Sequence, residues 1–296
     1  MDYRSLRGVV CASICPMRDD GTVDMAGVRR LTRYLVDSGI NCLYPNGTNG
    51  ESLSLTRDER RDIIKIVNDE NAGKAVLYNQ CGAGTVAESY DHVRFSAQLG
   101  VDGVGLMTPV FFQMDGEAMR RYYEDILPEV PALPVYAYNI PARSGNDLKA
   151  DMLGELMARH DNLKGIKYSY PDLRRIQQYL TCRADRHVSV LVGSDSLAMA
   201  CVLSGGDGWV SGPSAAYPKY HVALYDALSH GDIERAKALQ YRIIDIADSM
   251  DDIPEIPAIK YMLVKLGVIE SDYCRAPLRP LSAAEKRRLD ELMKTF

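Results

Sequence analysis

Short apolar runs alternate with longer amphipathic stretches along this chain, which is the pattern of repeated βα units. The spacing predicts helices over residues 25–38, 57–71, 87–99 and 148–159, among others. Eight apolar runs predict strands over residues 9–15, 40–44, 75–79, 103–107, 135–139, 163–168, 188–192 and 208–210. A six-stranded doubly wound sheet would leave two units without a place, so the expected fold is α/β, a (β/α)₈ TIM barrel.

Three similar helix-to-strand junctions support repeated βα units. The segments 38–41, 99–102 and 204–207 each end a predicted helix with glycine and open an apolar strand. Glycine at that place adopts the left-handed conformation that closes a helix before a short loop.

The C-terminal part contains more helix than a barrel needs. Residues 233–249, 256–266 and 283–294 predict three additional helices, and Ser282 with Glu285 forms a capping-box pattern before the last one. We expect the barrel, with the active site, to span residues 1–230 and the helical extension to span 231–296. No Gly/Ser-rich or Pro-rich linker separates them, so they are expected to form the same compact domain.

Composition narrows the class of protein. A chain of 296 residues with 46% hydrophobic residues can bury one large core, and its formal net charge of -5 is ordinary. It has no basic stripe for nucleic acid and no apolar run of the ~20 residues that cross a bilayer. The first eight residues lack an apolar signal core, so a cytoplasmic location is expected.

Cysteine and histidine usage gives no sign of a metal site or a disulfide framework. The seven cysteines are scattered and odd in number, and Cys11, Cys42, Cys81 and Cys201 lie in or beside apolar runs that predict core positions. The five histidines, at 92, 160, 187, 221 and 230, match no zinc spacing. We therefore expect no metal and no cofactor.

Lys167 is the residue that stands out. Active sites of such barrels lie at the carboxyl ends of the strands, and Leu163, Gly165 and Lys167 would share one face of the sixth strand. A buried amine loses its charge more easily, and a neutral amine forms an imine with a ketone. The alternative is a strand-end lysine that extends into solvent, and the lysine alone favours that alternative.

Other strand ends supply complementary groups. The Gly47–Gly50 loop offers backbone N–H groups for a carboxylate, and Thr48 adds a hydroxyl. Tyr138 can donate or accept a proton, and Arg143 can hold a second carboxylate with two hydrogen bonds. Taken singly, these residues are more often an ordinary turn, a core tyrosine and a surface arginine.

Together, these motifs resemble the dihydrodipicolinate synthase/N-acetylneuraminate lyase family of pyruvate-dependent class I aldolases. Two tail segments, 257–260 and 279–281, also resemble the family's C-terminal region. The family patterns Gly-Thr-Thr-Gly-Glu-Ser, Tyr-Asn-x-Pro-x-Arg-Thr-Gly, Gly-Ile-Lys and Gly-x-Asp are similar to Gly47–Ser52, Tyr138–Gly145, Gly165–Lys167 and Gly193–Asp195.

The resemblance implies a role for each site residue. Lys167 would form the Schiff base with pyruvate, Tyr138 would be the general acid/base, and Thr48 would relay a proton. The amides of Thr48 and Asn49 would hold the pyruvate carboxylate, and Arg143 would receive the carboxylate of aspartate semialdehyde. The other expected substrate-binding residues are Gly47, Ser169, Gly193, Asp195, Val210 and Ser211.

Several positions depart from the synthase pattern. Phe111 stands where the synthase relay has a tyrosine, and Asn49 replaces a threonine, as in some 4-hydroxy-2-oxoglutarate aldolases. Ser169 stands where N-acetylneuraminate lyases have a substrate-contacting threonine, whereas Ser196 stands where those lyases use glutamate and so argues against a neuraminate lyase. No single subfamily therefore matches at every position.

Three functions follow as expectations. The first is condensation of pyruvate with aspartate semialdehyde, favoured by Arg143. The second is an aldolase or dehydratase for a 2-oxo-3-deoxy sugar acid, N-acetylneuraminate or a 4-hydroxy-2-oxo acid. The third, of another class, is a non-catalytic sensor of 2-oxo acids, which Phe111 would suit and Lys167 with Tyr138 and Thr48 would not. By resemblance, the partners are small-molecule substrates and copies of the same chain in a homotetramer or dimer.

Overall fold

A closed parallel barrel forms the fold of the computed structural model, which describes residues 3–183 and 188–296. Within those residues eight strands follow one another around the barrel in chain order, with helices between them. The predicted TIM barrel is therefore confirmed. The strands are β1 (Gly8–Cys11), β2 (Cys42–Leu43), β3 (Val76–Gln80), β4 (Gly103–Met107), β5 (Val135–Asn139), β6 (Leu163–Tyr168), β7 (Ser189–Val192) and β8 (Gly208–Ser211).

Strands β4, β5 and β6 have the predicted bounds, whereas β1 and β2 are shorter than predicted. The apolar run at residues 9–15 continues past β1, and Ala12, Ile14 and Cys15 stay buried in the segment that follows. A strand buried on both faces and a buried loop have the same run of apolar residues. The apolar run at residues 9–15 therefore predicted a longer β1 than the structure has.

The helices that connect the strands end as the sequence predicted at three junctions. Gly39, Gly100 and Gly205 have φ angles of 81°, 75° and 96°, so each adopts the left-handed conformation after a helix. The helices up to β8 are α1 (Met25–Asp37), α2 (Arg57–Asn71), α3 (Val86–Leu99), α4 (Gly116–Glu124), α5 (Pro141–Ser144), α6 (Ala150–Arg159), α7 (Leu173–Cys182) and α8 (Ala198–Leu203).

The predicted additional helices are present at the C-terminal end. After α9 (Pro218–Ser229) come α10 (Ile233–Asp248), α11 (Glu255–Lys265) and α12 (Ala283–Met293). Ser282 and Glu285 form both bonds of the predicted capping box, which satisfies backbone groups at the start of α12. The expected boundary near residue 230 stays a prediction.

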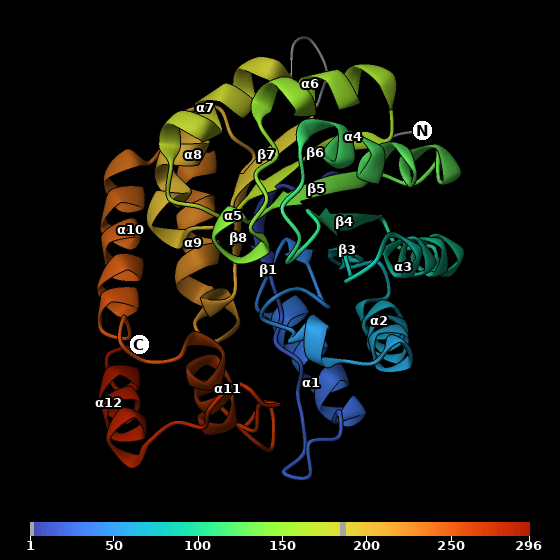
Figure 1. Ribbon diagram of the computed structural model, residues 1–296. Helices are drawn as coiled ribbons and strands as arrows, with labels where there is room; N and C mark the ends of the chain where they lie inside the picture. The colour runs from blue at the N-terminus through green and yellow to red at the C-terminus, as the bar shows by residue number, and fades with distance from the viewer. Residues whose placement is uncertain (1–2, 184–187) are drawn as a thin grey trace. The chain divides into compact units, whose positions relative to one another are not determined.

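The chain divides into two compact units by the density of its internal contacts. The first comprises the chain up to Val10 together with Val76–Val210, and the second comprises Cys11–Ala75 and Ser211–Phe296. In the first unit α6 packs against α4 and α7, beside the strands from β4 to β7 (Figure 1). In the second unit α1 packs against α2, α9 against α10 and α11 against α12.

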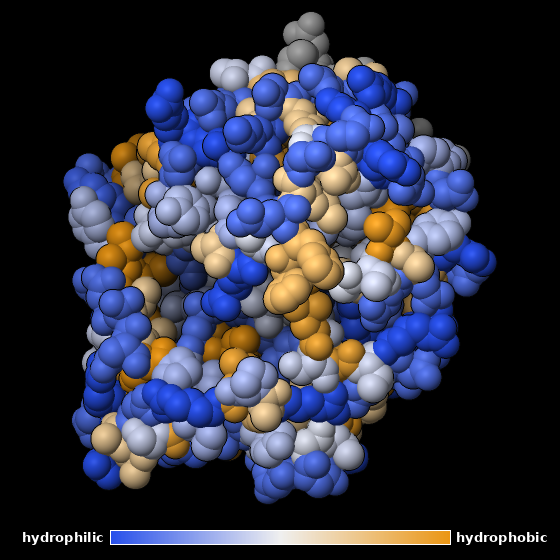
Figure 2. Space-filling view, viewed as in Figure 1, coloured by the Kyte–Doolittle hydropathy of each residue, from blue (hydrophilic) through white to orange (hydrophobic). Residues whose placement is uncertain are grey.

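Hydrophobic side chains lie mainly in the core, and hydrophilic side chains lie mainly at the surface. The four cysteines predicted as core residues, Cys11, Cys42, Cys81 and Cys201, are all buried. The face shown in Figure 2 is mainly hydrophilic, with apolar side chains in small separate groups. Among the helices of residues 3–183 and 188–296, none has both the length and the apolar character to span a membrane.

A substitution at Gly165, in β6, tests how tightly the strands of the barrel are packed. A methyl group there would overlap the Ser189 carbonyl of β7 and the Tyr136 ring, whereas one at Gly84 would meet nothing within 4 Å. We expect Gly165→Ala to lower the free energy of unfolding by about 1–3 kcal/mol because the neighbouring backbone must move. Gly84→Ala is the control, and chemical denaturation measures both. Equal stability of the two variants would contradict this packing.

Candidate active site

Lys167 and Tyr138 lie against each other at the ends of β6 and β5. The two strands are parallel neighbours, and their register pairs Tyr138 directly with Lys167. The Lys167 Nζ atom lies 3.8 Å from the centroid of the Tyr138 ring. Lys167 is 5% exposed and Tyr138 1%, so the amine is held in a desolvated place next to a phenol. The inward orientation predicted for Lys167 is what the structure has.

Tyr138 is fixed by apolar packing and by the adjoining loop. Its ring packs with Met107 and Ile140, and Val110 covers this group of side chains. The Tyr138 carbonyl accepts a hydrogen bond from the Thr108 amide at 2.9 Å. These contacts leave the Tyr138 ring little rotational freedom.

The loop after β5 presents Arg143 to solvent. Arg143 lies in the short helix α5, whose following residue, Gly145, has a φ angle of 77°. The Ser144 hydroxyl accepts a hydrogen bond from Thr108 and donates to the Ile140 carbonyl, which fixes the turn from inside. Arg143 is exposed, and its guanidinium makes no ion pair with any residue that the structure describes. It is therefore available to an anionic ligand.

The ends of β6 and β7 bring two other predicted residues together. The Ser169 amide donates to the Asn139 carbonyl, and the Gly193 amide donates to the Tyr168 carbonyl. A side chain at Gly193 would overlap the Ser169 hydroxyl, so only glycine fits beside it. Asp195 begins the 3₁₀ turn Asp195–Leu197 and is half-buried.

The second unit contains the predicted carboxylate loop after β2. Asn46 and Glu51, at the two ends of this loop, have φ angles of 58° and 55°. Among the described residues, no acceptor bonds the backbone N–H groups of Gly47, Asn49 and Gly50. Unpaired N–H groups in a mostly buried loop favour an anion. The binding of a carboxylate by the Thr48 and Asn49 amides of this loop stays a prediction.

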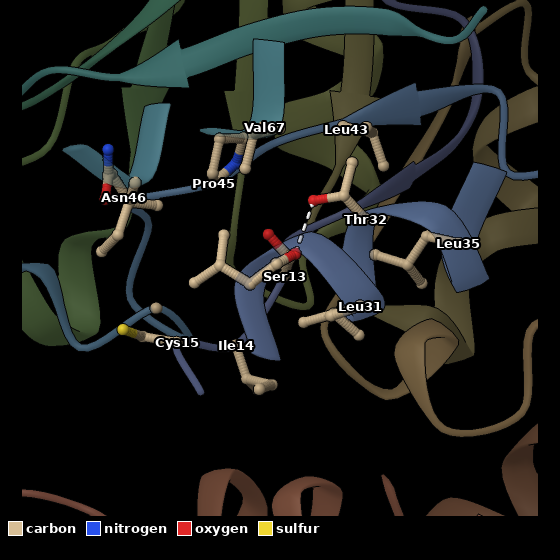
Figure 3. A pocket seen from close by; sticks show the side chains of 13 residues that line it. Ser13, Ile14, Cys15, Leu31, Thr32, Leu35, Leu43, Pro45, Asn46 and Val67 are labelled. Atoms are coloured by element: carbon tan, nitrogen blue, oxygen red, sulfur yellow. Dashed lines mark hydrogen bonds between the residues drawn. The ribbon is translucent and has the colours of Figure 1, made fainter. Parts of the chain in front are cut away.

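Apolar side chains pack against the loop after β2. Side chains of α1 and α2 pack there against β2 and the segment after β1, and Figure 3 shows Pro45 and Asn46 at its edge. The Asn46 amide donates to the Arg60 carbonyl of α2 at 3.0 Å. The enclosed cavity of about 10 Å³ holds at most one water molecule, so it is packing space rather than a substrate site.

A buried ion pair fixes the far end of the loop. The Lys260 Nζ atom of α11 donates to Glu51 Oε1 at 2.5 Å and to the Tyr273 carbonyl at 2.7 Å. The other Glu51 oxygen accepts the Arg275 amide at 2.9 Å. The side chains of Lys260 and Glu51 are 0% and 1% exposed. Both charges are therefore hydrogen-bonded where water cannot reach them.

Arg275 extends this network to the start of α2. Its guanidinium donates to both Glu59 oxygens and to the carbonyls of Gly21 and Ser54. The hydrogen bond from Arg275 lowers the pKa of Glu59 from 4.5 to about 2. This contribution to folding is therefore present above pH 4.5 and is lost as the pH falls toward 2.

Asn49 and Ser211 complete the predicted residues of the second unit. The Asn49 amide Nδ2 donates to Glu255 Oε1 at 2.9 Å, at the start of α11. A side chain at Gly212 would overlap the Asn49 amide, so this amide lies directly against the backbone that follows β8. The Ser211 hydroxyl accepts the Ser214 amide at 2.9 Å, which closes the turn after β8. Val210, a predicted residue of the first unit, is buried within β8.

Sequence reasoning assigned no function to Glu51, Lys260, Arg275 or Glu255. Two of them stood in segments that resembled the family, Glu51 in the loop motif and Lys260 in the tail. Their bonds join residues more than 200 positions apart, as in the Lys260–Glu51 pair at a separation of 209. A charged residue inside the apolar stretch of α11 was a further signal in the sequence.

Phe111 is not a buried replacement for the synthase tyrosine. It is 86% exposed, its φ angle is 75°, and its ring contacts Phe112 edge-to-face with 5.1 Å between centroids. The Asn146 side chain holds this loop through the carbonyls of Pro109 and Phe112 and the amide of Met114. The loop is therefore anchored while both phenyl rings remain outside the fold.

Other reactive side chains are poorly suited to catalysis. Burial raises the pKa of the Cys15 and Cys201 thiols to about 12, and it lowers the pKa of His221 to about 3. In the described part of the chain, no cluster of three His, Cys, Asp or Glu residues is placed to bind a metal ion. His187 lies outside the described residues.

A barrel with a buried lysine at the end of a strand is the arrangement used by class I, Schiff-base-forming enzymes. The model of the dihydrodipicolinate synthetase family matches residues 5–296 of the sequence. The chain belongs to this family, whose members are class I pyruvate-dependent lyases, and it is an enzyme of that class.

Two relatives and one solved structure illustrate this membership. A 4-hydroxy-tetrahydrodipicolinate synthase from Pelodictyon phaeoclathratiforme is 32% identical, covering 100% of this chain and 99% of that protein. An uncharacterized DapA-like lyase from Thermofilum pendens is 31% identical, covering 96% and 94%. The E. coli K12 protein YagE, solved in complex with pyruvate, is 26% identical with a TM-score of 0.93, covering 98% of each chain.

The Lys260–Glu51 pair can be tested through stability. Lys260→Met keeps the volume but leaves the Glu51 charge buried without its partner, and we expect a loss of about 3–5 kcal/mol in the free energy of unfolding. Adding Glu51→Gln to that variant should recover part of the loss because the uncompensated charge is removed. Urea denaturation at neutral pH measures both, and a strictly additive double variant would show that the two side chains do not interact.

Proposed function

We propose that this enzyme binds pyruvate as a Schiff base on Lys167 and condenses it with aspartate semialdehyde. The observation that supports the Schiff base is the desolvated Lys167 amine, 3.8 Å from the centroid of the Tyr138 ring. A lysine used only for solubility would extend to water, and burying one without a use costs free energy.

The chemistry proceeds through an imine and an enamine. The Lys167 amine attacks C2 of pyruvate, and the former keto oxygen leaves as water. Loss of a C3 proton gives the enamine, whose C3 forms a bond to the aldehyde carbon while the aldehyde oxygen takes up a proton. Hydrolysis then releases the product and the free amine. Tyr138 is the proposed proton donor and acceptor, and Thr48 is the proposed relay.

The carboxylate of pyruvate is assigned to the loop after β2. The N–H groups of Gly47, Asn49 and Gly50 have no acceptor among the described residues, and this supports an anion there. Ser169, Gly193, Asp195, Val210 and Ser211 are the other proposed substrate-binding residues. In a parallel barrel the strand ends that carry these residues belong to the active-site rim.

Arg143 supports aspartate semialdehyde as the second substrate. Its exposed guanidinium is not neutralised by any acidic residue in the described part of the chain, and such a group binds a carboxylate in two-point fashion. The synthase name of the Pelodictyon relative agrees with this choice.

Aldol cleavage or dehydration of a 2-oxo-3-deoxy sugar acid, N-acetylneuraminate or a 4-hydroxy-2-oxo acid is the second candidate. It is favoured by Asn49 in the loop and by the hydroxyl of Ser169 beside Gly193. A sensor without catalysis would have no use for a buried amine against a phenol, so we rank it last.

We also propose a cytoplasmic homo-oligomer, a tetramer or dimer. Phe111 and Phe112 are 86% and 72% exposed and pack edge-to-face, an apolar group that a second copy of the chain would cover. All seven cysteines are free thiols, as is usual in a reducing compartment.

Borohydride reduction in the presence of pyruvate tests the Schiff base. We expect a stable adduct on Lys167, mapped by mass spectrometry, because reduction converts the imine to a secondary amine. Lys167→Ala should lose both adduct and turnover while its unfolding transition stays cooperative. Lys164→Ala, on the same strand, is the matched control and should retain the adduct. An adduct on another lysine, or none with any 2-oxo acid, would contradict the mechanism.

Tyr138→Phe tests the proton donor. The ring packing is kept and the hydroxyl is lost, so kcat should fall by roughly 10²–10⁴-fold, while imine trapping falls less. Introducing a hydroxyl with Phe111→Tyr should raise synthase activity if a relay is incomplete there. An unchanged kcat in Tyr138→Phe would mean that another group moves the proton.

A further inference from the structure

Glu255 is a carboxylate beside the loop assigned to pyruvate, and neither the fold nor the reaction so far gives it a use. It is the first residue of α11 and is exposed. Its Oε1 atom accepts a hydrogen bond from the side-chain Nδ2 of Asn49 at 2.9 Å. The same Oε1 atom lies 3.3 Å from the position that a Cβ on Gly212 would occupy. The carboxylate therefore sits between the loop after β2 and the turn after β8.

One oxygen of this carboxylate remains open. Within residues 3–183 and 188–296, Asn49 is the sole hydrogen-bonding partner of the Glu255 side chain, and it bonds Oε1. Held by one oxygen, the group can present Oε2 in a fixed direction. Such an acceptor binds a hydroxyl or, more strongly, an ammonium group, and it repels a second carboxylate.

We propose that Glu255, oriented by Asn49, is a specificity-determining residue for the aldehyde. It accepts a hydrogen bond from an ammonium or hydroxyl group on that substrate. This inference rests on the proposed pyruvate Schiff base, and it deepens the proposed function by defining what the aldehyde must carry. Aldehydes without a donor group gain nothing from this contact.

A structural role is the alternative explanation. An acidic residue in the first turn of a helix interacts favourably with the helix dipole, which would stabilise α11 whatever the substrate. The two explanations differ in one measurable respect. A dipole effect changes stability and affects all aldehydes equally, whereas a specificity residue changes the ratio between aldehydes.

The test compares three aldehydes at saturating pyruvate: aspartate semialdehyde, glyceraldehyde and butanal, which has no donor. For Glu255→Gln we expect kcat/KM for aspartate semialdehyde to fall by roughly 10–100-fold relative to butanal if ammonium is the group bound. A fall confined to glyceraldehyde would identify a hydroxyl instead. Unchanged ratios for both would overturn the proposal.

Two further variants complete the design. Asn49→Thr keeps the backbone amide but removes the donor that orients Glu255, so the same ratio should fall. Glu234→Gln makes the same charge change on the exposed surface of α10 and should leave all three rates unchanged. Borohydride trapping of pyruvate on the unmodified enzyme separates the two levels: absence of an adduct overturns the proposed function, whereas an adduct with unchanged ratios overturns only the role of Glu255.

Discussion

The loop after β2, in the second unit, depends on a salt bridge that water cannot reach. Burying Lys260 and Glu51 costs hydration energy that their attraction offsets only when the remaining hydrogen bonds are made, and here Tyr273 and Arg275 make them. A pair of apolar side chains could provide equal stability. What the ion pair adds is direction, because it fixes Glu51 in a left-handed conformation and so sets the path of the loop. The N–H groups of Gly47, Asn49 and Gly50 keep their positions only while that path is kept.

In the first unit, strand register positions Lys167 and Tyr138. Parallel pairing of β5 and β6 places Tyr138 opposite Lys167, and Gly165 lets β6 approach β7 without a side chain between them. The amine is desolvated by the packing of the barrel rather than by a lid. Its environment is therefore set by the core, and the residues of the loops are free to differ between relatives with the same chemistry.

Much of this could be predicted from the sequence, for reasons that also explain the failures. Periodicity gave β4, β5 and β6 their bounds and turned Lys167 inward, because alternation in a strand is a local property. The segment after β1 was wrongly predicted as strand, because a buried loop is as apolar as a buried strand. The bonds of Glu51 and Asn49 to α11 span 209 and 206 residues, and no local pattern encodes such contacts. Motifs marked these positions without stating their partners.

Asn49 and Phe111, two of the departures from the synthase pattern, differ in kind. Phe111 is 86% exposed, lies outside the fold and has no hydroxyl. The Asn49 side chain is longer than the threonine it replaces, and its Nδ2 atom donates a hydrogen bond to the Glu255 carboxylate of α11. A threonine hydroxyl is one bond shorter and could not make the same contact without a shift of the loop. The contact between Asn49 and Glu255 therefore depends on the side chain at residue 49, and it links the loop after β2 to the start of α11.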